Sequence, residues 1–206
     1  MIKEIVKRIK ERYPKPKIEL DYSNPFELLV ALILSARCTD ARTNRITKEL
    51  FKKYPTPKEL KDADFDELNE IISSCSMHNT KAKNLIELAK KLCEKYNCEV
   101  PDSLEELTSL PGVGRKTANI VLSIGFGIPA VGVDTHVLRT ANRLGISNSK
   151  KVETVEKDIM EKVNQEDWIV FYTGLILLGR HICKAKKPDC KNCFLNDICP
   201  KIGVND

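Results

Sequence analysis

The chain has 206 residues, of which 42% are hydrophobic and 31% charged, with a formal net charge of +5. This length and composition suit one globular domain or two small ones with a sizeable core, and the mild positive charge is compatible with nucleic acid. No apolar run approaches the ~18 residues that span a bilayer, and residues 1–10 lack the apolar segment of a signal peptide. We therefore expect a cytoplasmic protein that does not bind membranes.

The first half of the chain predicts a series of helices. Ile2, Ile5 and Ile9 recur at helical spacing and predict an amphipathic helix that ends near 13–14. Asn24 is a suitable N-cap for the next helix, whose apolar run at 28–34 predicts a central, buried position. Further helices are expected over 41–54, from 56–57, from 64 to about 75, and over 80–96. Four cysteines scattered through this region are expected to be reduced thiols: Cys38, Cys75, Cys93 and Cys98.

The stretch 110–118 reads LPGVGRKTA and predicts a hairpin between two helices. A capping-box pattern at 102–105 begins the first, and Pro111 ends it near 109 because the residue before proline avoids the α conformation. We expect positive φ at Gly112 and Gly114 and a second helix over about 114–124. Free backbone N–H groups at its start favour an anion such as a DNA phosphate.

Two cations, Arg115 and Lys116, stand in the first turn of that second helix, where the macrodipole favours carboxylates. One interpretation is that both side chains hold phosphates. The other concerns Lys116, which shares a helix stripe with Ile120 and Ile124. A partly desolvated ammonium near a positive helix end has a lowered pKa, which makes its amine available as a nucleophile. The residues alone leave both interpretations open.

The second half of the chain is also helical, with helices expected over 135–144, 150–163 and 168–180. No strand or repeat is apparent, so the sequence predicts an all-α protein. Asp134 stands at a helix start, where a plain N-cap is the more common role. The Gly/Pro connection at 125–132 is long enough to return this helix start toward the hairpin, where a carboxylate could hold or deprotonate Lys116 or stabilise a sugar cation.

Four cysteines fall within seventeen residues near the C-terminus: Cys183, Cys190, Cys193 and Cys199. Disulfides are not expected in a cytoplasmic chain. Structural zinc is one alternative, although its ligands usually form two close pairs and Cys183 has no close partner. Four thiolates in a compact loop also suit a [4Fe–4S] cluster. The intervening Lys184, Lys186 and Lys187 form either a solvated loop or a loop that grips phosphate.

Together, the hairpin motif at 110–118, the VDTH motif at 133–136 and the four-cysteine pattern resemble the helix-hairpin-helix DNA glycosylases, most closely their endonuclease III branch. The resemblance runs in order from residue 25 to 199. It implies two helical domains with a DNA-binding cleft between them. One is a contiguous six-helix domain at 18–128. The other joins 1–17 to 129–206 and holds one [4Fe–4S] cluster in its loop at 183–199.

The resemblance also implies a mechanism, in which Lys116 attacks C1′ of a flipped, damaged nucleotide and Asp134 assists. A Schiff base forms, and β-elimination cuts the strand on the 3′ side. Arg37 stands where this branch commonly has a glutamine that fills the gap left by the flipped base. Met77-His78 replaces a leucine-tyrosine pair, and Met77 is expected to wedge into the base stack. The choice of damaged base and of opposite base is therefore open.

We expect a monomeric, bifunctional DNA glycosylase and AP lyase that acts on oxidised pyrimidines or abasic sites in double-stranded DNA. Two alternatives remain: a monofunctional mismatch glycosylase (adenine or thymine) of the same fold, and a non-catalytic DNA-binding module. The residues expected to contact DNA are Leu110, Gly112, Val113, Gly114, Arg115, Arg37, Met77, Lys184, Lys186 and Lys187.

Overall fold

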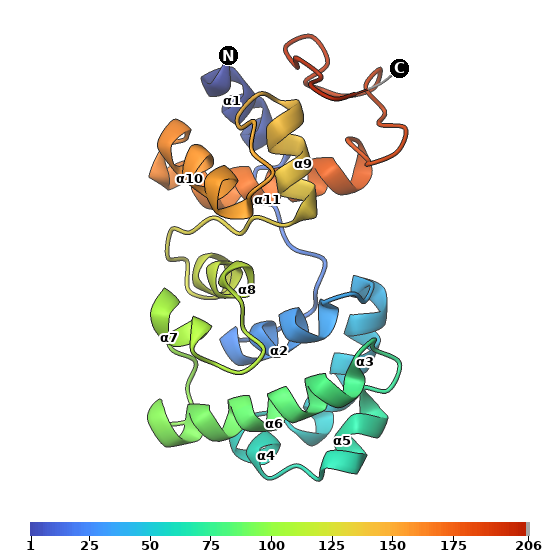
Figure 1. Ribbon diagram of the computed structural model, residues 1–206, viewed down its shortest axis with the longest axis vertical. Helices are drawn as coiled ribbons and strands as arrows, with labels where there is room; N and C mark the ends of the chain where they lie inside the picture. The colour runs from blue at the N-terminus through green and yellow to red at the C-terminus, as the bar shows by residue number, and fades with distance from the viewer. Residues whose placement is uncertain (205–206) are drawn as a thin grey trace. The chain divides into compact units, whose positions relative to one another are not determined.

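The structure, a computed structural model, describes residues 1–204, which form helices, turns and loops without a strand (Figure 1). The prediction of an all-α protein is confirmed. The chain forms two compact units. One is contiguous, Glu19–Gly127, and the other joins Met1–Ile18 to the chain from Ile128 onward. In the part of the chain that the structure describes, no helix has the length and apolarity to cross a membrane.

The contiguous unit is built around α2 (Pro25–Ser35). Asn24 caps this helix, accepting a hydrogen bond from Glu27 N at 2.9 Å, and Pro25 is its first residue, as predicted. Its central side chains are fully buried, and α3, α6 and α8 pack against it. The unit's other helices are α3 (Asp40–Lys53), α4 (Pro57–Lys61), α5 (Phe65–Ile71), α6 (His78–Lys95), α7 (Leu104–Thr108), α8 (Arg115–Ile120) and the π-helical turn η1 (Val121–Gly125).

Two helix boundaries differ from the sequence prediction at the turn between α5 and α6. Helix α5 ends at Ile71 rather than near Cys75, because residues 72–77 already turn, with Cys75 N donating to Ile72 O over 2.8 Å. Helix α6 begins at His78 rather than at residue 80, since Met77 supplies its start in a left-handed conformation without a side-chain cap.

The helix predicted over 114–124 is divided. It is α-helical through Ile120 and then widens into η1, where Phe126 N donates to Val121 O, five residues back, over 3.2 Å. The buried Ser123 lies in this segment, and its hydroxyl donates to Asn119 O at 2.8 Å.

Cys93 and Cys98 are joined by a disulfide, so the prediction of reduced thiols is wrong for this pair. Helix α6 ends at Lys95, and Asn97 and Cys98 take φ values of 53° and 60°. The chain therefore turns back, Cys98 N donates to Leu92 O over 3.0 Å, and the two sulfurs meet. Cys38 and Cys75 are free thiols, as expected.

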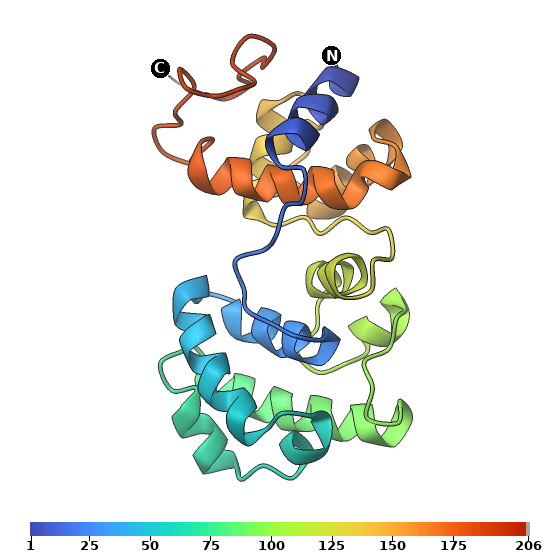
Figure 2. The ribbon, with the colours of Figure 1, turned by 180° about the vertical axis from the view of Figure 1, so that it is seen from behind.

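The second unit is organised on α11 (Trp168–His181), which contacts α1 (Ile2–Arg12) and α9 (Thr135–Arg143) (Figure 2). Helix α10 (Val152–Lys162) packs on α9, and the 3-10 turn η2 (Gln165–Asp167) leads into α11. Two glycines of α11 permit close packing. A Cβ at Gly174 would lie 2.5 Å from a methyl group of Ile9, and one at Gly179 would lie 2.9 Å from His136.

Candidate functional site

The predicted hairpin forms between α7 and α8 in the contiguous unit. Ser103 caps α7, accepting from Glu106 N and donating to the Glu106 carboxylate at 2.7 Å. Leu110 and Val113 are buried, and Val113 N donates to Leu110 O over 3.2 Å, which closes the turn. These two side chains therefore anchor the hairpin to the core and are not exposed to a ligand.

The two hairpin glycines have different roles. Gly112 has a φ of +77°, as predicted, and a Cβ there would lie 3.2 Å from the Asn84 side chain. The prediction of positive φ is wrong for Gly114, which is the N-cap of α8 with φ −92° and ψ 170°. An N-cap takes extended dihedrals, so the helix start itself sets this geometry. No atom lies within 4 Å of a Cβ placed at Gly114, so the backbone there stays open to an approaching group.

Arg115 and Lys116 begin α8, and both are exposed. The partial desolvation of Lys116 that one of the two interpretations assumed is therefore not present in the DNA-free chain. Ile120, one turn further along, is buried as expected, but the first turn of this short helix projects beyond the packed part of the unit. Any desolvation of the Lys116 amine must come from a bound substrate.

Asp134 is the N-cap of α9, as the sequence predicted. Its Oδ1 atom accepts from His136 N and from Val137 N, both at 2.8 Å. Both cap bonds use the same oxygen, so Oδ2 takes no part in capping. The half-buried Asp134 lies in the second unit, whereas Lys116 lies in the contiguous unit.

Arg37 and Met77 both take the left-handed conformation, with φ values of 57° and 60°. Such a conformation costs a residue with a side chain on the order of 1–3 kcal/mol, and such strain concentrates at functional sites. Both side chains are exposed, Met77 to 57%. The residues stand in two turns, 36–38 and 75–77, which we call the paired turns.

The paired turns are held together by contacts that the sequence analysis did not identify. Ser76 Oγ donates to Arg37 O over 2.8 Å, and the Cys75 sulfur lies 3.9 Å from that of Cys38. The Nζ of Lys81 donates to Leu34 O, just before the first turn, and to Ala36 O at its start. A signal for Lys81 exists in the sequence, since it continues the buried stripe of Leu85, Leu88 and Leu92 on α6.

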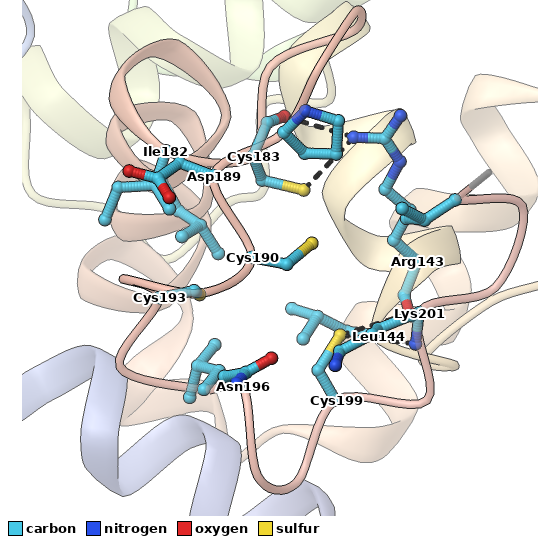
Figure 3. Close-up of a pocket in the computed structure, with 14 residues that line it drawn as sticks. Arg143, Leu144, Ile182, Cys183, Asp189, Cys190, Cys193, Asn196, Cys199 and Lys201 are labelled. Atoms are coloured by element: carbon cyan, nitrogen blue, oxygen red, sulfur yellow. Dashed lines mark hydrogen bonds between the residues drawn. The ribbon is translucent and has the colours of Figure 1, made fainter. Parts of the chain in front are cut away.

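The loop after α11 brings the four C-terminal cysteines to one pocket, which Arg143 and Leu144 of the α9 end also line. Figure 3 shows their thiol groups turned toward this pocket. Burial raises the pKa of Cys193 and of Cys199 above the ordinary value. The buried side-chain oxygen of Asn196, which also lines the pocket, has no hydrogen-bond partner.

Arginines fix this cysteine loop to the helices of its unit. Arg143 donates to Cys183 Sγ at 3.3 Å and to the carbonyls of Lys184 and Ala185 at 2.7 and 3.2 Å. Arg8 of α1 binds both carboxylate oxygens of Asp197 at 2.6 and 3.0 Å and holds the pKa of that carboxyl below its usual value. Three lysines at the start of the loop are exposed: Lys184, Lys186 and Lys187.

Comparison with known proteins places this geometry in a family. Residues 30–165 match the model of the HhH-GPD superfamily base excision DNA repair protein, a range that contains the whole α7–α8 hairpin. A thermostable thymine-DNA glycosylase, 24% identical over 97% of this chain and 95% of its own, has a TM-score of 0.88 and shares the fold.

Closer similarity is found to endonuclease III. The *Bacillus subtilis* (strain 168) protein is 49% identical over 193 residues, covering 93% of this chain and 88% of its own. The *Escherichia coli* (strain K12) protein is 41% identical, covering 95% and 93%. A solved structure of a trapped endonuclease III–DNA covalent intermediate is 43% identical, covers 97% of this chain and 94% of its own, and has a TM-score of 0.92. The chain belongs to the endonuclease III family of the HhH-GPD superfamily.

Proposed function

We propose that this chain is a bifunctional DNA glycosylase and AP lyase that removes oxidised pyrimidines from double-stranded DNA. The observation that carries this function is Lys116, an exposed amine in the first turn of the hairpin helix. A chain 43% identical to this one forms a covalent intermediate with DNA, which requires a nucleophile on the protein. Lys116 matches that requirement within the family's hairpin motif.

In the proposed reaction, the neutral Lys116 amine attacks C1′ of the flipped nucleotide, and the bond from C1′ to the damaged base breaks. The amine loses its protons as the sugar ring opens, which leaves an imine between Nζ and C1′. Loss of the C2′ proton then expels the 3′ phosphate by β-elimination. Asp134 assists this reaction through its Oδ2 atom, because its Oδ1 atom already accepts hydrogen bonds from the backbone amides of α9.

The DNA contacts follow from the exposed groups. The open backbone at Gly114 and the cations of α8 suit a phosphate of the damaged strand. Arg37 and Met77 project from the paired turns toward the base stack. The exposed Lys184, Lys186 and Lys187 add phosphate contacts whose strength depends on salt. The protein acts as a cytoplasmic monomer on duplexes with damaged bases or abasic sites.

We further propose that Cys183, Cys190, Cys193 and Cys199 hold one [4Fe–4S] cluster per chain. A single tetrahedral zinc would draw four sulfurs to about 3.8 Å from one another, given Zn–S bonds of about 2.3 Å. Among the residues that the structure describes, no three metal-binding side chains are arranged for one ion. The four-cysteine pocket supplies the four thiolates that a [4Fe–4S] cluster takes, and an Asn196 amide turned over would present N–H donors to the cluster.

When bound, the cluster would hold the four cysteines of the loop in a fixed arrangement. We assign it this structural role because neither glycosyl transfer nor β-elimination moves electrons. Protein prepared without air should contain about four irons and matching sulfide, and Cys190→Ser should lose them while Cys38→Ser retains them. One zinc per chain in the same preparation would contradict the assignment.

The test of the activity uses a duplex with one abasic site, with and without borohydride. Borohydride should reduce the Lys116 imine to a stable protein–DNA adduct, and without it the strand should be cut. Lys116→Gln should abolish both results and still bind the duplex, whereas Lys90→Gln, which removes an exposed lysine elsewhere in the unit, should retain both. Base removal without cutting would indicate a monofunctional glycosylase, and binding alone would indicate a DNA-binding module.

A further inference from the structure

Lys81 is a buried lysine that connects two distant parts of the contiguous unit. Only 6% of its surface is exposed. Its Nζ donates to Leu34 O at 2.9 Å and to Ala36 O at 2.7 Å, which are carbonyls at the C-terminal end of α2. Its own backbone N donates to Met77 O over 3.0 Å in the first turn of α6. One residue therefore binds the chain on both of the paired turns.

The burial of this ammonium calls for an explanation. Burial lowers the pKa of Lys81, because removing the charge from water disfavours it. The charge is compensated by the carbonyls at the end of α2, where the macrodipole favours a cation. An apolar side chain would fill the same space in the α6 stripe without this desolvation, so packing alone does not account for a lysine.

What Lys81 holds is the relative placement of two strained turns. Leu34 and Ala36 lead directly into Arg37, and Met77 lies one helical turn before Lys81. Ser76 Oγ makes a second connection to Arg37 O at 2.8 Å. Neither left-handed residue has a glycine's freedom, so each needs surrounding contacts to keep its backbone conformation.

We propose that Lys81 is a positioning residue that fixes Arg37 and Met77 as one preassembled two-pronged element for the base opposite the lesion. This inference rests on the proposed function, since it takes the paired turns to enter the base stack. Without the Lys81 ammonium, the two prongs move independently. The enzyme then loses its hold on the opposite base while its chemistry at Lys116 continues.

The test uses a duplex with 2-aminopurine opposite a tetrahydrofuran abasic-site analogue, which the enzyme binds and cannot cut. Binding of the wild type should raise the 2-aminopurine fluorescence, because the two prongs take this base out of its stack. Lys81→Met, which keeps the length of the side chain and removes its charge, should lose most of that rise at saturating protein. Lys83→Met, an exposed lysine two residues away, should behave as wild type.

Kinetics provide a second measurement. For a duplex with an oxidised pyrimidine, Lys81→Met should raise KM about tenfold, because a misplaced contact weakens binding outside the reaction centre. For a duplex with an abasic site, kcat for strand cutting should stay near the wild-type value. Ser76→Ala, which removes one exposed contact and does not threaten the core, should change both measurements in the same direction by less. If Lys81→Met does not fold, Ser76→Ala decides the question.

Failure of the inference about Lys81 can be distinguished from failure of the proposed DNA contacts. If Arg37→Ala and Met77→Ala abolish the fluorescence rise and folded Lys81→Met retains it in full, Lys81 does not position the prongs and the inference is wrong. If Arg37→Ala and Met77→Ala also leave the rise unchanged, the paired turns do not read the opposite base, and the DNA-contact part of the proposed function fails with it.

Discussion

The guanidinium of Arg143 donates a hydrogen bond to the sulfur of Cys183 over 3.3 Å. Arg143 is the last residue of α9, and Asp134 caps the first turn of the same helix. The helix therefore connects a proposed catalytic carboxylate at one end to the cysteine loop at the other. Arg139, one turn earlier, reinforces this connection by donating to Cys183 O at 3.0 Å.

Removing the Arg143 guanidinium should loosen the cysteine loop. We expect Arg143→Met to lose iron to a chelator roughly tenfold faster than wild type. Replacing a residue that hydrogen-bonds to a metal ligand typically lowers metal affinity by 10- to 100-fold. Arg143→Lys, which keeps the charge and cannot make all of these contacts, should fall between. The measurement is the decay of visible absorption. Equal rates for all three proteins would show that the loop does not depend on Arg143.

Replacing Asp134 separates capping from catalysis. Asparagine caps a helix as well as aspartate does, so Asp134→Asn should keep its free energy of unfolding within about 1 kcal/mol of wild type. If the carboxylate acts on the sugar, base removal should nevertheless fall by roughly 10²–10⁴-fold. Asp134→Ala should show the same loss of activity together with lower stability. Normal turnover by Asp134→Asn would leave the residue with a capping role alone.

Arg37 makes a prediction about substrate choice. Its guanidinium donates hydrogen bonds and accepts none, so it suits an opposite guanine, whose O6 and N7 are acceptors. We expect faster removal of an oxidised pyrimidine opposite guanine than opposite adenine. Arg37→Ala should shrink this preference and spare abasic-site cutting, whereas Arg45→Ala, an exposed arginine on α3, should keep it. Equal wild-type rates for both opposite bases would show that Arg37 does not read the partner strand.

The thiols of the paired turns should differ in reactivity. Burial raises the pKa of Cys75 to about 11, so roughly one molecule in a thousand carries its thiolate at pH 8. Alkylation of Cys75 in the folded protein should therefore be slow at pH 8 and accelerate toward pH 11, with the half-buried Cys38 as internal reference. Peptide mass analysis measures both. Labelling of Cys75 at the unfolded rate at pH 8 would contradict its burial.

The same shift has a consequence for stability. The folded-state pKa of Cys75 is raised above its ordinary value of 9.0, so the unfolded chain releases this proton first as the pH rises. The unfolded state then binds fewer protons, and the contribution of Cys75 to stability, which is complete below pH 9, is lost between about pH 9 and 11. Cys75→Ala should flatten this part of the stability curve.

The features predicted correctly from the sequence depend on neighbouring residues. The caps at Asn24 and Asp134 and the positive φ at Gly112 follow from interactions within a few positions. The four C-terminal cysteines could likewise be grouped by their spacing alone. Such features need no knowledge of the rest of the fold.

The features that sequence reasoning missed depend on contacts made only after folding. The Cys93–Cys98 disulfide needs two consecutive left-handed residues after α6, and neither of them is a glycine. The π-helical turn η1 lies in the buried part of the contiguous unit, against α2, and no local sequence pattern marks it. The role of Lys81 was not identified because its partners lie 45 and 47 residues earlier in the chain.

The place of α1 on the second unit has a consequence for biosynthesis. Arg8 binds Asp197 across 189 residues, and Gly174 of α11 receives Ile9. A ribosome adding 5–20 residues per second needs about 10 to 40 s to cover that separation. The contiguous unit is completed within this time and is free to fold, whereas the apolar stripe of α1 still has no partner. Chaperone capture during translation should therefore concentrate on this first helix.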